Sequence, residues 1–320
     1  MTTLHRLPDA PADAVVAREP QPIRPRPVRR RKITATLTGW GFVAPAMIVI
    51  VGLSFFPAAW AFLLSLQEWN GFAPAEFVGA ENYTSLMTDG EFWEAVGHTG
   101  LYVTLFVPAS VLAGLFLAVA LNRNIRFIGV YRTAIFVPFV ASAAATGILS
   151  TYLFNPQFGL ANNVFRVLGL PPQGWLEDPS QAMLVIAIMS LWGQAAFTTV
   201  IYLAALQDVP TELLEAAQID GANRWQTFWR VVWPGLGPVT VFVTVWQVIG
   251  ALQLFDLVYT TTRGGPLDST KTIVYFLWEK AFKSLDFGYG SAAAYVLFAV
   301  TLLITVGMVI FARRRNMEAF

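Results

Sequence analysis

The chain has 320 residues, of which 56% are hydrophobic and 13% are charged, and its formal net charge is +1. Soluble domains average about 45–50% apolar and about 25% charged residues, so this composition excludes an ordinary soluble domain and predicts an all-α polytopic membrane protein. The sequence contains no cysteine, which excludes disulfides and thiol chemistry.

The N-terminal segment, residues 1–35, is rich in proline and arginine and poor in aromatic residues. A segment of this composition cannot bury enough apolar surface to fold, so we expect a disordered cytosolic tail. It has no apolar core of the kind found in signal peptides, and the first membrane span is therefore the expected membrane signal. Its basic residues are expected to set the topology and to contact anionic lipid.

Six stretches of spanning length contain no charged residue, and a helix needs about 20 such residues to cross the hydrocarbon core. They are Trp40–Leu66, Leu101–Leu121, Thr133–Phe154, Ala182–Leu206, Gly235–Phe255 and Ser291–Ala312. We therefore predict six transmembrane helices. The first span and its outer loop would occupy residues 36–99, the remaining spans a core over 100–312, and a cytosolic C-terminus 313–320.

Lysine and arginine are concentrated before the first span, between the second and third, between the fourth and fifth, and after the sixth. The loop after the first span, residues 67–100, has six acidic residues and no lysine or arginine. By the positive-inside rule, both termini and the loop around Glu215 should be cytosolic. The last outer loop, residues 261–290, departs from this pattern, since it holds Arg263, Lys271, Lys280 and Lys283.

The longest polar, amphipathic segment predicted to be cytosolic lies between Pro210 and Pro234. Thr211 or Asp208 is expected to cap a short helix that runs to about Ile219, because a side-chain oxygen can accept from the free amide groups of the first turn. Asp220-Gly221 should end this helix, since glycine tolerates the left-handed backbone that follows a helix.

A second short helix is predicted to begin at Asn223, with Gln226 three residues later in a capping box. Its apolar residues recur at helical spacing and form one stripe, Trp225, Phe228, Trp229 and Val232. The segment is therefore expected to contain two helices at an angle, joined at Gly221. An alternative is a surface loop whose aromatic stripe rests on lipid headgroups.

Catalytic motifs are missing from the sequence. It contains no Gly-Lys pair, which excludes a phosphate-binding loop of the Gly-Lys-Ser/Thr type. Its two histidines, His5 and His98, and its lack of cysteine make a zinc-type metal site improbable. We therefore expect no catalytic residue, no metal and no cofactor in this chain, and predict that any energy is supplied by another subunit.

At the Glu215 loop the sequence resembles a known family. Glu215-Ala216-Ala217, Asp220-Gly221-Ala222 and the later Pro234 are similar to the signature cytosolic loop of permease subunits of binding-protein-dependent ABC importers. Other residues resemble the carbohydrate-uptake branch, the maltose and glycerol-3-phosphate type: Gly79, Glu81, Asn82, Tyr83, Phe92, Trp93, Thr99, Gly264, Gly265, Pro266 and Thr270. The resemblance covers about residues 40–315.

This resemblance implies a type I ABC importer permease fold in the bacterial cell membrane. The segment Glu215–Ala222 would be a coupling helix that docks on one of two ATP-binding subunits, which would hold ATP and Mg. A second homologous permease and an extracellular solute-binding protein would complete the transporter. Gly264–Pro266, by itself a turn signal, would belong to an outer loop that touches the binding protein or closes over the cavity.

Polar and aromatic residues in the fourth and fifth spans are candidates for the substrate pathway, because polar groups inside spans usually face an interior cavity. They are Trp192, Gln194, Phe197, Trp246, Gln247 and Gln253. The alternative is hydrogen bonding between helices by glutamine and threonine, with interfacial tryptophans.

The six spans contain no lysine or arginine, which favours a neutral sugar over an anionic substrate. The alternative is a glycerol-3-phosphate or glycerophosphodiester importer permease. Less favoured are an ion-coupled carrier or channel, for which we find neither an acid at mid-span nor an internal repeat, and a membrane-anchored assembly protein. No nucleic-acid partner is expected.

Overall fold

The computed structural model of the chain describes residues 28–123 and 126–314, with side chains from residue 38 onward. The predicted disordered tail, residues 1–35, lies mostly outside the described residues, although helix α1 begins within that range, at Val28. Of the predicted C-terminal tail, 313–320, only the first two residues are described. The chain divides into two units, residues 1–57 and 58–320, which are described separately.

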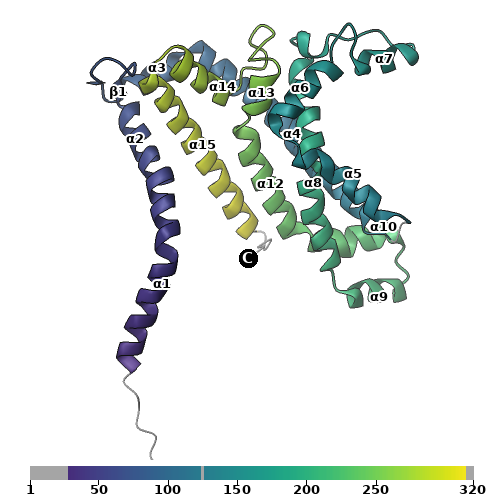
Figure 1. Cartoon of the computed structure of the whole chain (residues 1–320). Helices are drawn as coiled ribbons and strands as arrows, with labels where there is room; N and C mark the ends of the chain where they lie inside the picture. The colour runs from purple at the N-terminus through teal and green to yellow at the C-terminus, as the bar shows by residue number, and fades with distance from the viewer. Residues whose placement is uncertain (1–27, 124–125, 315–320) are drawn as a thin grey trace, which may run out of the picture. The chain divides into compact units, whose positions relative to one another are not determined.

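The described chain is mostly helical (Figure 1). The helical elements run α1 Val28–Ile50, η1 Val51–Phe55, α2 Phe56–Ser65, α3 Glu81–Thr88, α4 Gly90–Leu121, α5 Ile128–Val140, α6 Ala143–Leu153, α7 Leu160–Val167, η2 Trp175–Glu177, α8 Ala182–Gln207, α9 Thr211–Ile219, α10 Arg224–Thr227, η3 Phe228–Val232, α11 Trp233–Gly235, α12 Gly237–Leu252, α13 Asp256–Thr260, α14 Ile273–Trp278, η4 Glu279–Lys283 and α15 Phe287–Arg314. Two antiparallel strands of two residues each, β1 Gln67–Glu68 and β2 Glu76–Phe77, are the only strands among the described residues.

Five of the six predicted spans are confirmed with adjusted ends. Within the described residues, five helical stretches are long and apolar enough to cross a membrane: Thr38–Ser65, Gly90–Leu121, Ala182–Gln207, Gly237–Thr260 and Phe287–Arg314. Six spans result if the bent pair α5 and α6 counts as one. The second span is longer than predicted, because α4 continues back through the charged residues of its first turns to Gly90. In the first unit, the described side chains are mostly exposed and apolar, as lipid contact requires.

The third predicted span, Thr133–Phe154, is not one helix. It is split into α5 and α6, whose axes differ by 100°. Pro138 lies in the last turn of α5 and has no amide hydrogen to continue the helix, and Ser142 caps α6 by accepting from the Ala145 amide at 3.2 Å. Hydropathy measures length and polarity only, so it could not show this break.

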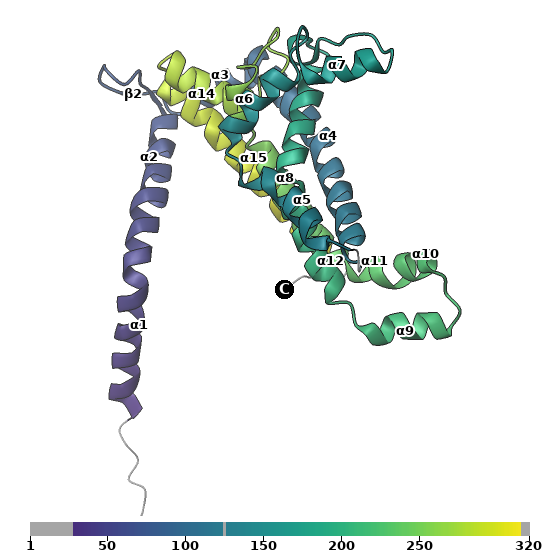
Figure 2. The same cartoon turned by 45° about the vertical axis from the view of Figure 1, so that its right-hand side comes forward.

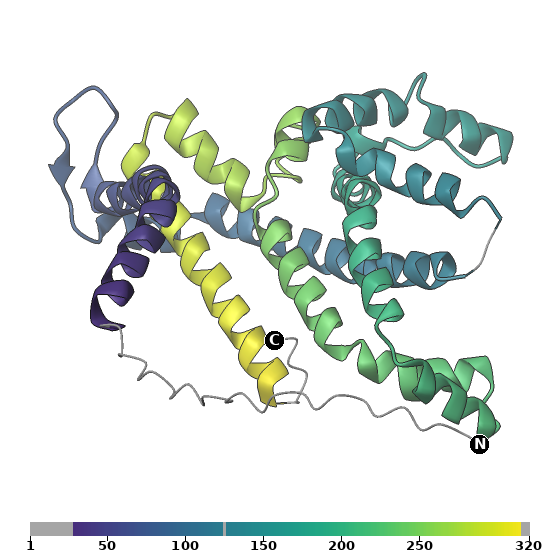
Figure 3. The same cartoon turned by 60° about the horizontal axis from the view of Figure 1, so that its bottom comes forward.

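Within the second unit, α4 and α8 pack against each other and α12 packs on both. Figure 1 places α3, α13 and α14 at one end of this unit and α9 and α10 at the other. Helix α15 packs on α12 and α14 (Figure 3). Three apolar clusters form the core of the described part of the chain. One of them joins α4 and α8 to α13 and α14 through residues such as Tyr102, Ile186 and Val258.

Gly114 on α4 allows the close approach of α8. A Cβ atom at this position would lie 2.2 Å from Cγ2 of Thr198 and 3.1 Å from the Thr198 carbonyl carbon. A contact this short leaves no room for any side chain, and small residues at helix interfaces are the usual means of close packing in membranes.

We expect Gly114→Ala to destabilise the protein by about 1–3 kcal/mol, because α8 must move to admit the methyl group. The melting temperature of the purified protein in detergent measures this. Gly100→Ala is the matched control, since Gly100 lies on the same helix with open space around it. Alanine there should leave the melting temperature unchanged or raise it. Equal melting temperatures for the two variants would contradict the packing role of Gly114.

Candidate functional site

The polar segment after α8 forms a helical hairpin. Helix α9 and the continuous stretch α10–η3 fold back on each other and lie side by side at the end of the unit (Figure 2). The predicted helix end at Ile219 and the break at Asp220-Gly221 are confirmed. The predicted cap is wrong: the N-cap position is Pro210, and neither Thr211 nor Asp208 caps the helix with its side chain.

Gly221 makes the turn between the two helices, with φ at +77°. The Ala222 amide donates to the Ala217 carbonyl at 2.9 Å and the Gly221 amide donates to the Gln218 carbonyl at 3.0 Å. These two bonds form a Schellman motif, which satisfies carbonyls at the helix end and favours glycine at the left-handed position. The backbone therefore holds α9 at a defined angle to the next helix.

The second helix begins with the predicted capping box, which is confirmed. Asn223 Oδ1 accepts from the Gln226 amide at 2.9 Å, and Gln226 Oε1 accepts from the Asn223 amide at 2.9 Å. The predicted apolar stripe is divided between two faces. Phe228 and Val232 pack on the core cluster of α4, α8 and α12, whereas Trp225 and Trp229 are exposed. The π-helical turn η3, which widens the helix by one residue per turn, accompanies this division.

The residues predicted for coupling lie on and just after α9. Glu215, Ala216, Asp220 and Gly221 are exposed, while Ala217 and Ala222 are half-buried. Small exposed side chains next to one carboxylate leave the helix open to close approach by another surface. Helix α9 therefore projects from one end of the unit, at the opposite end from α3, α13 and α14 (Figure 1).

A cavity of about 320 Å³ lies where two helical breaks meet. One break is the bend between α5 and α6, and the other is the gap between α12 and α13 at residues 253–255. Its lining also includes parts of α4 and α8. Broken helices free backbone groups and widen the space between spans, and irregular backbone at membrane depth is tolerated where it lines a cavity.

The six predicted pathway residues divide into two groups. Gln194, Gln247 and Gln253 line the cavity, whereas Trp192, Phe197 and Trp246 are not among its lining residues. The Phe197 ring stacks on Trp246 with centroids 5.4 Å apart, and the row extends to Phe139 and Phe242 at 6.4 Å on either side. This aromatic row (Phe139, Phe197, Trp246, Phe242) crosses α5, α8 and α12. Trp246 within the row and Trp192 outside it are both about half exposed.

Gln247 is buried and is committed to a hydrogen-bond network between helices. Its Nε2 donates to Thr198 Oγ1 at 2.9 Å and also to Ser110 Oγ, and these two hydroxyls lie 3.2 Å apart. The network joins α4, α8 and α12 inside the apolar bundle. For Gln247 the alternative expectation, hydrogen bonding between helices, matches the structure, although its side chain also lines the cavity.

We expect Gln247→Leu to lower the free energy of unfolding by about 1–2 kcal/mol, since it removes two interhelical hydrogen bonds in an apolar region. The measurement is thermal unfolding in detergent. Gln253→Leu is the matched control, because Gln253 is exposed and lines the cavity without a described side-chain bond. It should unfold at the wild-type temperature and alter ligand handling instead. A lowered unfolding temperature for Gln253→Leu together with an unchanged one for Gln247→Leu would contradict the assignment of Gln247 to helix packing and Gln253 to the cavity.

Sequence reasoning missed several residues of the cavity. Tyr102, Thr146, Ser190 and Asp256 line it, the last of these on the first turn of α13. The signal that could have found them is the pair of helix-breaking positions, Pro138-Ser142 and Gln253–Phe255. Each break brings residues distant in sequence to the same space.

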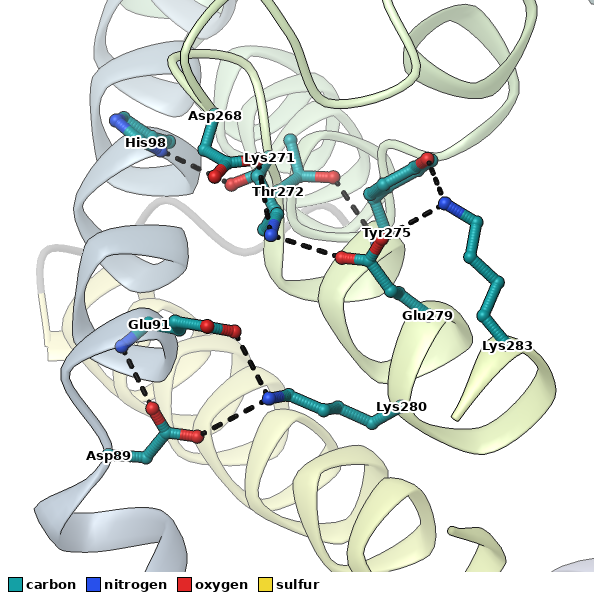
Figure 4. A network of polar contacts seen from close by, with 10 residues as sticks. All are labelled: Asp89, Glu91, His98, Asp268, Lys271, Thr272, Tyr275, Glu279, Lys280 and Lys283. Atoms are coloured by element: carbon teal, nitrogen blue, oxygen red, sulfur yellow. Dashed lines mark hydrogen bonds and ion pairs between the residues drawn. The ribbon is translucent and has the colours of Figure 1, made fainter. Parts of the chain in front are cut away.

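An ion-pair network holds the α14 end together (Figure 4). Lys280 Nζ contacts Glu91 at 3.0 Å and Asp89 at 4.0 Å, which ties η4 to the start of α4. Glu279 contacts Lys271 at 3.0 Å and Lys283 at 2.9 Å. Lys271 has a second carboxylate partner, Asp268, at 3.2 Å. Thus the three lysines that disturb the predicted charge pattern of this loop are all paired with carboxylates.

The network shifts the pKa of its members. Partial burial raises the pKa of Glu279, but hydrogen bonds from Lys283 and Lys271 outweigh this and hold it below its usual value. Burial lowers the pKa of Lys271, yet its bonds to Glu279 and Asp268 raise it above its usual value. Both groups are therefore charged at neutral pH, as ion pairs require.

Because the folded-state pKa of Glu279 lies below its ordinary value of 4.5, its stabilisation is present above that pH and is lost as the pH falls through the folded-state value. We expect the melting temperature of the wild type to fall more between pH 7 and pH 4 than that of Glu279→Gln. At pH 7 the variant should be less stable by about 1 kcal/mol or less, since the pairs are partly exposed. Parallel pH curves for the two proteins would contradict a role for this carboxylate.

Comparison with known proteins gives a consistent result. Residues 110–317 match the family described as binding-protein-dependent transport system inner membrane component. The chain is 35% identical over 286 residues to the lactose transport system permease protein LacF of Rhizobium radiobacter, covering 88% of this chain and 95% of the relative. It is 32% identical over 277 residues to the sn-glycerol-3-phosphate transport system permease protein UgpA of Agrobacterium fabrum, covering 85% and 94%.

Among solved structures, a chain of a bacterial alginate ABC transporter, crystallised with its pentasaccharide-bound periplasmic protein, has a TM-score of 0.81. The match covers 91% of this chain and 99% of that chain, at 19% identity. At this identity the likeness shows the fold, and the fold is that of a type I ABC importer permease.

Proposed function

Since this chain belongs to the family of inner membrane components of binding-protein-dependent transport systems, we propose that it is one permease subunit of an ATP-driven sugar importer. It would form the translocation pathway together with a second homologous permease. The observation that carries the proposal is the arrangement of a projecting polar helix, α9, at one end of the spans and a polar-lined cavity between helical breaks farther along the same spans.

Coupling to ATP hydrolysis is assigned to α9 and its turn. Glu215 and Ala216 are exposed on a helix whose angle is held by the Schellman turn at Gly221. A rigid projecting helix with small side chains suits insertion into a cleft of a partner. We assign ATP and Mg to two ATP-binding subunits. This chain by itself is not an enzyme on this proposal.

The proposed orientation places α9 and both termini in the cytosol of a bacterium and the α14 end outside. The number of basic residues in 261–290, which is four, argues against placing the α14 end outside. Three of them are paired with Asp89, Glu91, Asp268 and Glu279, so they add little free positive charge on that side. Of the other lysines and arginines, Arg166 and Arg263 lie on the outer side and the rest on the cytosolic side, so the bias in their number follows the positive-inside rule.

The other partners are assigned to the remaining surfaces. An extracellular solute-binding protein would meet the α14 end, where Gly264–Pro266 forms part of a loop held by hydrogen bonds from Thr270 to Gly264 and Gly265. The second permease would cover the exposed aromatic row, because exposed aromatic residues on neighbouring spans suit a helix interface. The exposed apolar face of the first unit would contact the lipid bilayer.

A neutral sugar is the proposed substrate. One relative is named for lactose transport and another for sn-glycerol-3-phosphate transport, so similarity alone does not distinguish a sugar from a phosphate substrate. The spans of this chain contain no lysine or arginine to neutralise a phosphate, which favours the sugar. A glycerol-3-phosphate or glycerophosphodiester importer is the second candidate, supported by the identity with UgpA.

Site-directed crosslinking tests the coupling role. Because the chain contains no cysteine, an introduced cysteine is its only thiol and the site of reaction is unambiguous. In membranes that contain the complete transporter, Ala216→Cys with a short reagent that joins a thiol to an amine should capture an ATP-binding subunit through a lysine of that subunit, and added ATP should change the yield. The matched control is Ala75→Cys, an exposed alanine between β1 and β2 at the other end of the unit. Capture of an ATP-binding subunit by Ala75→Cys, or its absence with Ala216→Cys, would contradict the proposal.

A further inference from the structure

One charged residue lines the cavity. Among its described lining residues, Asp256 is the only one with a formal charge, and no lysine, arginine or histidine accompanies it. It occupies the first position of α13, directly after the break that follows α12. Its side chain is exposed to the cavity side and makes no ion pair with any residue that the structure describes. The charge of this space is therefore negative.

The same cavity contains a hydroxyl without a partner. Ser190 is only 7% exposed, and its Oγ makes no hydrogen bond within the described chain. The Tyr102 hydroxyl comes near it but does not reach the geometry of a hydrogen bond. A buried hydroxyl without a partner costs about 1–3 kcal/mol, so a polar group supplied by a ligand or by water would be stabilised there.

Further polar groups surround this hydroxyl. Gln194 lies one helical turn along α8 from Ser190, and Gln253 lies at the end of α12, on the other side of the break from Asp256. Both amides line the cavity and are exposed, and each can both donate and accept. Hydroxyl, amide and carboxylate groups on several elements match a ligand with many hydroxyl groups.

We propose that this cavity binds a hydroxyl-rich ligand that carries no negative charge, and that Asp256 determines this specificity by repelling anions. The inference rests on the proposed importer function and narrows its substrate to neutral sugars or sugars with an amino group. A carboxylate in a cavity between protein walls acts over a longer distance than it would in bulk water, because the local dielectric constant is lower and the walls focus the field. A phosphate or uronate would meet this charge with no cation nearby in the lining.

The test measures the charge of the cavity directly and needs no knowledge of the substrate. Gln194→Cys places a single thiol in the lining of a chain that has no other. In membranes with the complete transporter, its reaction rate is compared for two methanethiosulfonate reagents, the cationic ethyltrimethylammonium and the anionic ethylsulfonate. Modification is followed on the peptide of this chain by mass spectrometry. A shift in the pKa of the thiol alters both rates alike, so their ratio reports the local potential.

Adding Asp256→Asn should lower the cation-to-anion rate ratio about three- to tenfold, the size expected for loss of one nearby charge. Asp256→Glu should keep the ratio, and Asp256→Ser is a second neutral variant in case the asparagine protein does not accumulate. Asp268→Asn, which removes an acid at the α14 end outside this lining, should leave it unchanged. Ala75→Cys should show the same ratio with and without Asp256→Asn.

Two outcomes would overturn the inference. A thiol that reacts but keeps its ratio in the neutral variants would remove Asp256 as the source of specificity. A thiol that reacts with neither reagent would show that the cavity is closed to charged solutes of this size. Neither result bears on crosslinking of Ala216→Cys to an ATP-binding subunit, so failure of this inference and failure of the importer function are distinguishable.

Discussion

The contact between α4 and α8, on which α12 also packs, is the constraint on which the arrangement of the other spans depends. In lipid, apolar side chains gain little by meeting one another, so helices associate through close packing and polar bonds. Both are present at one level of the bundle. Gly114 lets the backbone of α8 approach, and Ser110, Thr198 and Gln247 bond to one another across three helices. These contacts fix the positions of α8 and α12, the two helices that connect the cavity with the hairpin of α9 and α10.

The two ends of those helices carry different chemistry. Helix α8 passes the cavity at Ser190 and Gln194 and then leads through Gln207 into α9. The chain returns by α10 and η3 into α12, which passes the buried network at Gln247 and breaks at Gln253 beside the cavity. The proposed coupling would run from the hairpin to the cavity through these two helices, which are bonded to each other midway. This continuity gives the proposed coupling a physical path without any further moving part.

Polar residues within the spans serve two purposes that hydropathy cannot separate. Gln247 and Gln253 lie six positions apart on the same span, yet one is buried in hydrogen bonds and the other faces open space. The difference arises because α12 ends before Gln253, so that residue is released from the helix face that packs on α4 and α8. Trp246 likewise joins a row of rings from three helices, an arrangement that depends on how α5, α8 and α12 meet.

The sequence alone determined the membrane class, the positions of the spans and the local form of the hairpin, because charge-free length, the Asp220-Gly221 break and the Asn223–Gln226 box act over a few neighbouring residues. The family was also readable from contiguous residues, Glu215 to Ala222. Only the tertiary structure decided where the third span bends, which lysines are neutralised and which glutamines face the cavity. Each of these depends on contacts between residues far apart in the chain, such as Lys280 with Glu91 or Gln247 with Ser110, and no local pattern encodes such a distance.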